Sequence, residues 1–244
     1  MTRASLPMYD WPECRAETDA TWAAIRDGAR ARLPGIDLPD ALSAPDWSAI
    51  EAYWRDPGLV FSQTCWGPLS LGLIAVLEPL AQPDYSAFEG GRGPFYRSAL
   101  IAREGAVRAV PDTPGAALPE GLLAGKRFGM NGPESLSGYL SLSDDLGADP
   151  CALAAECVHT GGHRGSVQAV AEGRADIAAI DCRSWALARR FEPCAEGLVV
   201  VGWTAERWGL PYVTSRATEA GVKSALRDTL TQLGCFAAPE GGQR

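Results

Sequence analysis

The chain has 244 residues, of which 46% are apolar and 21% charged, and its formal net charge at pH 7 is −8. A chain of this length and composition can bury one large core or two smaller ones, which excludes a disordered or fibrous protein. Acidic residues outnumber basic ones 30 to 22, and the isoelectric point is near 4.9. Nucleic acid is therefore not an expected partner, because binding to its phosphates needs a concentrated Lys and Arg surface.

Short apolar runs alternate along the chain with segments whose apolar residues recur at helical spacing. This alternation predicts an α/β fold, in which parallel or mixed sheets are covered by helices. In chain order, the expected strands are 6–9, 59–62, 95–102, 127–130, 156–159, 175–180, 198–201 and 212–215, and the expected helices are 19–32, 46–53, 67–76, 137–144, 165–172, 182–190 and 218–233.

A polar, glycine-rich stretch at 84–94 interrupts this alternation, and we expect the chain to cross between two lobes there. If the strands after Asp181 return to the first sheet, the chain crosses a second time. The expected lobes are residues 1–91 with 183–244, and residues 92–182. A cleft between two α/β lobes is a common ligand site.

The most apolar run, 69–77, is about half as long as the ~20 residues that a membrane-spanning helix needs. We therefore expect no insertion into a membrane. The N-terminal sequence carries no apolar run of the length found in a signal peptide. As the sequence stands the protein is expected in the cytoplasm, and in the periplasm if a leader was removed.

The cysteines give no sign of a metal site. Seven of them, an odd number, occur with no CxxC pair and no spacing typical of zinc ligands, so reduced thiols are the default interpretation. The sequence also lacks a Walker loop, a GxGxxG fingerprint, an HExxH motif and a GxSxG elbow, so no cofactor is expected. Cys65 has neither a His nor a cation beside it to activate the thiol, which leaves little basis for an enzyme.

The turn Asn131-Gly-Pro-Glu-Ser-Leu-Ser-Gly-Tyr139 lies between an expected strand and an expected helix. The start of a helix offers unpaired N–H groups and a positive dipole end. Ser135 and Ser137 add hydroxyl donors, which together with those N–H groups suit a tetrahedral oxyanion. The alternative is that these serines only cap the helix.

Further candidates lie at the ends of other expected strands. A second turn, Thr160-Gly-Gly-His163-Arg164, adds donors for the same anion, or else forms a solvated cap. Asp181 either pairs with an ammonium group of the ligand or caps the helix that follows. Tyr9 and Trp66, in the other lobe, offer flat faces to a ligand, although aromatic residues in such places are as often packing residues.

These motifs resemble the solute-binding proteins of phosphonate- and phosphate-type ABC importers, which have a type 2 periplasmic binding protein fold. The matching residues, in the family's order, are Gly125-Lys-Arg127, Ser135-Leu-Ser-Gly-Tyr139, Gly161-Gly-His163, Ala169-Val170, Gly173, Asp176 and Asp181. The resemblance implies that Ser135, Ser137 and His163 bind the oxygens of a phosphonate or phosphate. At the expected helix start we add the amide of Gly138, and the N–H of Leu136 also remains as a donor. Leu136 stands where the family often has Thr, which removes one hydroxyl donor.

The same resemblance implies that Tyr9 and Trp66 close over the ligand from the facing lobe. The expected function is capture of a phosphonate- or phosphate-like oxyanion, without a covalent step, for an ABC transporter permease. Two alternatives stay open, because a fold does not decide a function. One is a cytosolic enzyme on the same fold, of the thiamine-pyrimidine or menaquinone pathway type, and the other is a metabolite-sensing module.

Overall fold

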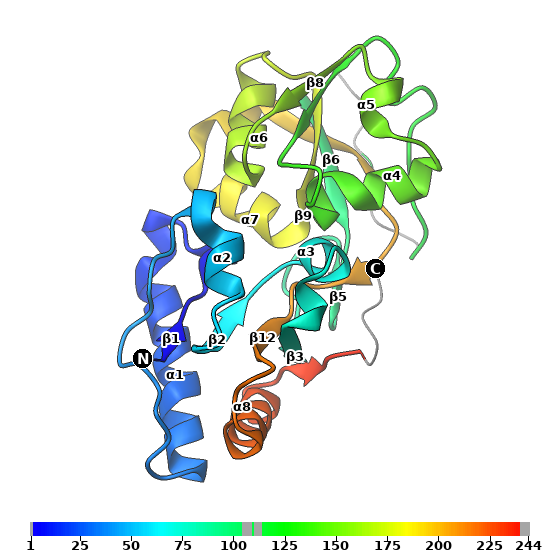
Figure 1. The fold of residues 1–244 in the computed structure, drawn as a ribbon. Helices are drawn as coiled ribbons and strands as arrows, with labels where there is room; N and C mark the ends of the chain where they lie inside the picture. Colours follow the sequence, from blue (N-terminus) through cyan, green and yellow to red (C-terminus); the bar gives the residue numbers. More distant parts are fainter. Residues whose placement is uncertain (1, 104–108, 110–113, 240–244) are drawn as a thin grey trace. The chain divides into compact units, whose positions relative to one another are not determined.

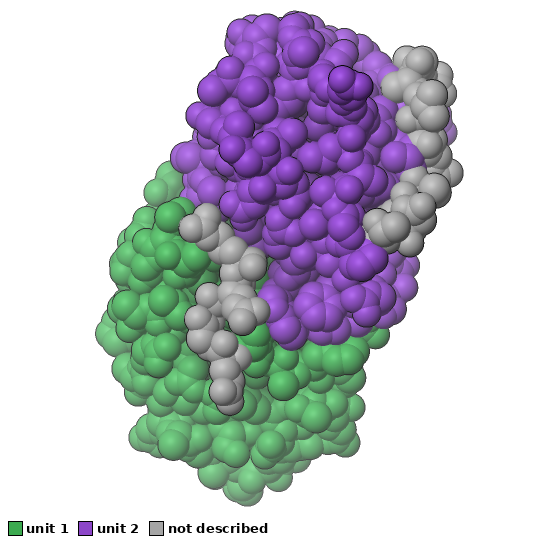
Figure 2. Space-filling view, turned by 90° about the vertical axis from the view of Figure 1, so that its right-hand side faces the viewer, with its two compact units in different colours: residues 1–84, 209–244 green, residues 85–208 purple. Residues whose placement is uncertain are grey.

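The computed structural model describes residues 2–103, 109 and 114–239, which form two compact units. Unit 1 contains residues 1–84 and 209–244, and unit 2 contains residues 85–208 (Figure 2). Each unit is built on a mixed sheet with helices, so the α/β class expected from the sequence is confirmed (Figure 1). Within the described residues, no helix combines the length and the apolar character needed to cross a bilayer.

Unit 1 contains a five-stranded sheet in the order β1-β2-β12-β3-β13, in which only β1 and β2 are parallel. The strands are β1 (Arg3–Ala4), β2 (Leu59–Gln63), β3 (Leu77–Gln82), β12 (Tyr212–Ser215) and β13 (Phe236–Ala237). The helices are α1 (Arg15–Arg32), α2 (Ile50–Trp54), α3 (Trp66–Ser70) and α8 (Ala220–Gln232), with 3-10 turns η1 (Pro7–Tyr9), η2 (Pro12–Cys14), η3 (Trp47–Ala49) and η4 (Leu73–Ala75). In its core, Trp22 of α1 stacks on Phe61 of β2, with ring centroids 5.4 Å apart.

Unit 2 contains a five-stranded sheet in the order β10-β6-β9-β7-β8 and a small sheet in the order β11-β5-β4. The strands are β4 (Gly91–Arg92), β5 (Phe95–Tyr96), β6 (Ser98–Arg103), β7 (Arg127–Met130), β8 (Glu156–His159), β9 (Ile177–Asp181), β10 (Leu198–Trp203) and β11 (Arg207–Trp208). The helices are the π-helix η5 (Leu136–Leu140), α4 (Ser141–Leu146), α5 (Pro150–Leu153), α6 (His163–Ala171), α7 (Cys182–Phe191) and the 3-10 helix η6 (Pro193–Gly197). Leu100, Phe128 and Leu142 bring β6, β7 and α4 into one core.

In unit 2, the parallel pairing of β7, β8 and β9 decides where polar loops meet. β7 pairs in parallel with both β8 and β9, so the carboxyl ends of these three strands lie along one edge of the sheet. In open α/β sheets, ligands bind outside the carboxyl ends of the strands. The turns that follow β7, β8 and β9 are therefore brought together by the sheet itself.

Three expectations about the elements are corrected. Residues 6–9 were expected as a strand, but Pro7 begins the 3-10 turn η1, since proline cannot donate to a strand ladder. The expected helix 67–76 is interrupted after α3, and β3 follows it, a strand whose signal is masked by its internal Pro79. The strand 198–201 was considered for a return to the first sheet, whereas β10 pairs with β6 in unit 2.

The strands that begin at Leu59 and Arg127 lie in separate sheets, as a two-lobed chain requires. The boundaries of the compact units differ from the expected lobe boundaries, because residues 85–91 and 183–208 lie in unit 2. The pairing of β10 with β6 and of β11 with β5 accounts for this difference at the second boundary, since both strands extend the sheets of unit 2.

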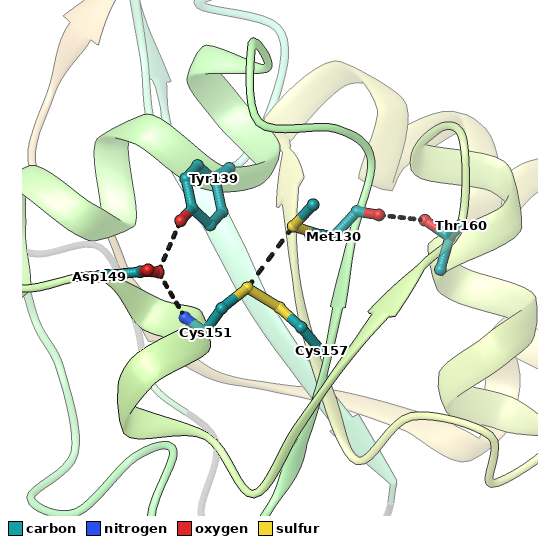
Figure 3. The surroundings of a disulfide bond; sticks show 6 residues. All are labelled: Met130, Tyr139, Asp149, Cys151, Cys157 and Thr160. Carbon is teal, nitrogen blue, oxygen red and sulfur yellow. Dashed lines mark hydrogen bonds between the residues drawn. A yellow bond between two sulfur atoms is a disulfide. The ribbon is translucent and has the colours of Figure 1, made fainter.

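The default interpretation of reduced cysteines is wrong for one pair. Cys151 of α5 and Cys157 of β8 form a disulfide, with their Cα atoms 5.3 Å apart (Figure 3). This Cα separation lies within the ordinary range for a disulfide. The six-residue separation of the two cysteines in the sequence does not by itself indicate that α5 and β8 bring them together. The other cysteines are thiols.

Candidate functional site

The turn after β7 ends in a capped helix start. Ser135 has extended backbone angles, and its Oγ accepts a hydrogen bond from the N–H of Gly138 at 3.0 Å. The Nδ2 atom of Asn131 donates to the same Oγ at 3.3 Å. A hydroxyl oxygen has two acceptor positions and one proton, so these two bonds leave the Ser135 O–H as a donor. Capping and anion binding are therefore compatible roles for Ser135.

Gly138 lies where no side chain fits. A Cβ atom at this position would be 2.8 Å from Cγ and Nδ2 of Asn131 and 3.0 Å from Ser135 Oγ. Leu136 is 1% exposed, so its side chain is buried and only its backbone faces the turn. The first N–H groups of a helix have no partner within the helix. Leu136 therefore lacks the hydroxyl donor that Thr would supply, but its backbone N–H remains as a donor.

His163, the first residue of α6, joins two of the predicted site residues. Its Nε2 atom lies 2.7 Å from Ser137 Oγ and 3.1 Å from Asp181 Oδ2. The His163 side chain is 14% exposed and that of Asp181 is 1% exposed, so this contact is largely shielded from water. Burial lowers the pKa of His163, while the negative charge of Asp181 and a hydrogen bond to the Ala179 backbone act in the opposite direction. The solvated cap considered for His163 is therefore wrong.

This Ser, His and Asp arrangement is not that of a hydrolase. In a catalytic triad, the serine and the aspartate contact different nitrogens of the histidine ring. Here Ser137 and Asp181 both contact Nε2. The arrangement instead fixes the ring position and leaves the Ser137 hydroxyl able to donate to another group when Nε2 carries the proton.

Asp181 is a helix cap and a partner of His163. Its Oδ1 atom accepts hydrogen bonds from the N–H groups of Arg183 at 3.1 Å and Ser184 at 2.9 Å. Its Oδ2 atom faces His163. The predicted helix cap is confirmed, and both carboxylate oxygens have partners within unit 2. Arg164, the other cation of this turn, pairs with Glu192.

A chain of hydrogen bonds connects the turns after β7 and β8. Thr160 Oγ1 lies 2.9 Å from the Met130 carbonyl oxygen and 2.6 Å from Ser166 Oγ, and its single proton can be donated to either of them. Ser166 Oγ donates to Asn131 Oδ1 at 3.0 Å, and Asn131 in turn donates to Ser135. The sequence assigned no role to Asn131, Thr160 or Ser166. Their only signal was their polarity within the two turns already identified.

The two aromatic candidates lie in unit 1 and are packed. Tyr9 of η1 is 4% exposed, and Trp66 at the start of α3 is 1% exposed. With the Gln82 amide oriented to satisfy its neighbours, Trp66 Nε1 donates to Gln82 Oε1 at 2.9 Å. Both residues thus have a packing role in unit 1. That they also close over a ligand stays a prediction.

The chain matches one family of known proteins over most of its length. A family model described as "ABC transporter, phosphonate, periplasmic substrate-binding protein" matches residues 73–242. No curated protein matches the chain.

Two of the similar solved structures are phosphonate-binding proteins by description. A binding protein component of an ABC phosphonate transporter from Pseudomonas aeruginosa is 20% identical, with a TM-score of 0.68 over 97% of this chain and 80% of that chain. PhnD1 from Prochlorococcus marinus, in complex with methylphosphonate, is 14% identical, with a TM-score of 0.67 over 99% of this chain and 94% of that chain. An ancestral arginine-binding protein bound to arginine is 12% identical, with a TM-score of 0.58 over 96% and 92% of the two chains. These similarities confirm the expected type 2 periplasmic binding protein fold.

Proposed function

The chain belongs to the family of phosphonate-type periplasmic substrate-binding proteins of ABC transporters, and from this premise we propose that unit 2 captures a phosphonate- or phosphate-like oxyanion at the turn of Ser135 and Ser137. Proteins of this family bind a solute and do not transform it, so the chain is not an enzyme. The observation that carries the proposal is the contact of 2.7 Å between Ser137 Oγ and His163 Nε2 beside a helix start.

Several donors at this turn suit a tetrahedral oxyanion. We propose that the hydroxyls of Ser135 and Ser137 and the N–H groups of Leu136 and Ser137, which belong to three consecutive residues at a helix start, donate to the same anion. The helix start adds a partial positive charge of roughly half a unit. A hydrogen bond to a charged group contributes about 1.5–3 kcal/mol. Three such bonds would contribute about 4.5–9 kcal/mol before the cost of association is subtracted, and micromolar binding corresponds to about 8 kcal/mol.

Within this proposal, Gly138 and Asp181 support the site rather than bind the ligand. The N–H of Gly138 donates to Ser135 Oγ, which orients the serine hydroxyl outward. Asp181 holds the His163 ring through Oδ2 and the start of α7 through Oδ1. We therefore do not assign Asp181 to an ammonium group of the ligand. His163 lies beside Ser137 and is, in this proposal, a further donor to the anion.

The proposal extends to a partner and a compartment. A substrate-binding protein delivers its ligand to a membrane permease, and we propose a permease of the phosphonate type as the partner. The Cys151–Cys157 disulfide supports function outside the reducing cytoplasm, because disulfides persist in compartments such as the bacterial periplasm. The family is periplasmic by its description.

Calorimetric titration tests the proposed function. We expect inorganic phosphate or methylphosphonate to bind the purified protein with one site, whereas arginine, a ligand without phosphorus, does not bind. Binding of arginine, with no response to any phosphorus oxyanion, would contradict the proposal.

A further inference from the structure

We infer that the Cys151–Cys157 disulfide positions the oxyanion turns of unit 2, an inference that rests on the proposed function. The disulfide joins α5 to β8, and hydrogen bonds connect these two elements to Tyr139 of η5 and to the Met130 carbonyl at the end of β7 (Figure 3). Among the described residues, neither cysteine forms a hydrogen bond with Ser135, Ser137 or His163, so the effect acts through intermediate contacts.

The first step concerns β8, a short strand whose residues are only partly buried. β8 has four residues and, among the described strands, lies at the edge of the sheet and pairs only with β7. None of its residues is fully buried. A short edge strand with little buried apolar surface depends on other links to stay in register. The disulfide at Cys157, in the interior of β8, is such a link.

The second step leads from β8 to the turn that carries His163. Thr160 follows the last residue of β8, its N–H donates to the Met130 carbonyl at 2.9 Å, and its Oγ1 lies 2.9 Å from the same oxygen (Figure 3). Thr160 Oγ1 also lies 2.6 Å from Ser166 Oγ on α6. A shift of β8 relative to β7 would break these bonds, and α6 with His163 at its first position would lose its anchor.

The third step leads from α5 to the helix that carries Ser137. Asp149 caps α5, since its Oδ1 accepts from the N–H of Cys151 at 2.8 Å. The same oxygen accepts from the Tyr139 hydroxyl of η5 at 2.5 Å, and this bond raises the pKa of Tyr139 to about 12 (Figure 3). The Sγ atom of Cys151 also lies 3.7 Å from Met130 Sδ, at the end of β7.

Together these contacts form a closed ring of linked residues that includes Ser135 and the turn after β8. The ring runs from η5 through Tyr139 and Asp149 to α5, across the disulfide to β8, and through Thr160, Ser166, Asn131 and Ser135 back to η5. The disulfide is the covalent cross-link between the two arms of this ring. Each hydrogen bond of this ring contributes little net stability, so removal of the disulfide should loosen the contacts on both sides of it.

Hydrogen exchange and ligand titration of the double variant Cys151→Ser/Cys157→Ser test the inference. We expect amides of residues 156–166 and 135–139 to exchange at least about tenfold faster in the double variant. A tenfold increase corresponds to a decrease of only ~1.4 kcal/mol in the free energy of local opening. We expect methylphosphonate to bind about threefold to thirtyfold more weakly, because the released residues must be ordered again on binding. The thermal transition should stay cooperative.

The control is Cys235→Ser, which removes a half-buried thiol of unit 1 and should change neither exchange at 156–166 nor the affinity. If the double variant does not fold, the wild-type protein is measured after reduction with a phosphine, which is oxidised to its oxide while the two sulfurs become thiols with protons from water. If hydrogen exchange at 156–166 is unchanged in the protein without the disulfide, the inference is overturned, whatever the affinity for methylphosphonate. If neither the wild type nor the variant binds methylphosphonate while exchange still becomes faster, the proposed function is contradicted, and the inference that the disulfide positions the two turns is supported.

Discussion

Ser137 Oγ and His163 Nε2 lie 2.7 Å apart, although Ser137 belongs to the helix after β7 and His163 begins the helix after β8. The contact is possible because β7 and β8 are parallel neighbours whose carboxyl ends lie at the same edge. Each residue thereby limits the position of the other before any ligand arrives. An oxyanion that accepts from both groups meets donors that need little reorganisation.

Ser137→Ala should weaken methylphosphonate or phosphate binding by about tenfold to a hundredfold. The substitution removes one charge-assisted hydrogen bond, which is worth about 1.5–3 kcal/mol, and also removes the partner of His163 Nε2. Calorimetric titration measures the change. Ser143→Ala is the matched control, because Ser143 lies on α4 and its hydroxyl donates to the Ala148 carbonyl. Equal affinities of the wild type and Ser137→Ala would identify the turn as a capped helix only.

His163→Gln should reduce the pH dependence of both stability and binding. The folded-state pKa of His163 is lowered by burial, so the unfolded chain binds more protons below its pKa of roughly 6.5 and the fold loses stability as the pH falls through that value. A bound oxyanion favours the protonated ring, so binding should take up a proton at pH values above the lowered pKa of His163 in the free protein.

Calorimetry of this reaction in two buffers with different ionisation enthalpies measures the proton uptake. The difference between wild type and His163→Gln cancels the titration of the ligand itself. An identical proton uptake in both proteins would show that His163 does not face the anion.

Asp176→Asn should destabilise the protein by about 1–2 kcal/mol at pH 7 without changing the affinity. Asp176 Oδ1 accepts from Arg127 at 2.9 Å and Arg103 at 2.8 Å, and these bonds, first of all that of Arg127, hold the pKa of Asp176 well below its usual range. Because the folded-state pKa is depressed, this contribution is present above the unfolded pKa of about 3.9 and is lost as the pH falls below it. The arginines are partly exposed, which keeps the effect small.

Urea unfolding at pH 7, 5 and 3 measures this contribution. The loss of stability between pH 5 and pH 3 should be smaller in Asp176→Asn than in the wild type. Asp228→Asn, at an exposed position of α8, is the control and should leave the pH profile unchanged. A parallel profile for Asp176→Asn and wild type would refute the assignment.

The two roles of Asp181 can be separated by two substitutions. Asp181→Asn keeps an oxygen that can accept from the N–H groups of Arg183 and Ser184, whereas Asp181→Ala removes the cap. Asp181→Ala should therefore be about 1 kcal/mol less stable than Asp181→Asn. Both lose the negative charge that raises the pKa of His163, so the ring should titrate at lower pH in both. NMR titration of the ring protons measures this, and an unchanged pKa in Asp181→Asn would contradict the contact.

Much of the fold could be predicted because its signals are local. The strands 127–130 and 156–159 were expected with the bounds of β7 and β8, since each is a short run that ends at a polar or glycine-rich turn. The turns of Ser135 and His163 were recognisable for the same reason. Their small and hydroxyl residues stand between an apolar strand and a helical pattern, which is how helix starts are specified.

The rest depends on contacts between distant parts of the chain. The pairing of β10 with β6 unites residues about a hundred positions apart, and no local pattern in 198–203 distinguishes one sheet from the other. The disulfide depends on how α5 turns into β8, which the spacing of Cys151 and Cys157 does not determine. The roles of Asn131 and Ser166, which are 35 positions apart in the sequence, arise only when the two turns face each other.

Gly138→Ala should weaken oxyanion binding at least about tenfold while the protein remains folded. The new Cβ would lie 2.8 Å from Asn131, whose side chain is held by Ser166 and Ser135 and so has little freedom to move. Overpacking of this kind costs about 1–3 kcal/mol, and here the displaced group supports the Ser135 hydroxyl. Gly221→Ala on α8 is the control, because its Cβ would lie 3.7 Å from Leu33 Cδ2, an ordinary contact, and alanine should stabilise the helix by about 0.5–1 kcal/mol.

A double-mutant cycle with Asn131→Ala distinguishes this steric cause from a general loss of the turn. If Gly138→Ala acts by displacing Asn131, then Asn131→Ala should cost less affinity in the Gly138→Ala background than in the wild type, by about 0.5 kcal/mol or more, because the side chain has already lost its place. Calorimetric affinities of the four proteins measure the coupling. Additive losses would mean that Gly138 and Asn131 act on the ligand independently, and the account of the turn as a set of mutually supporting donors would then be wrong.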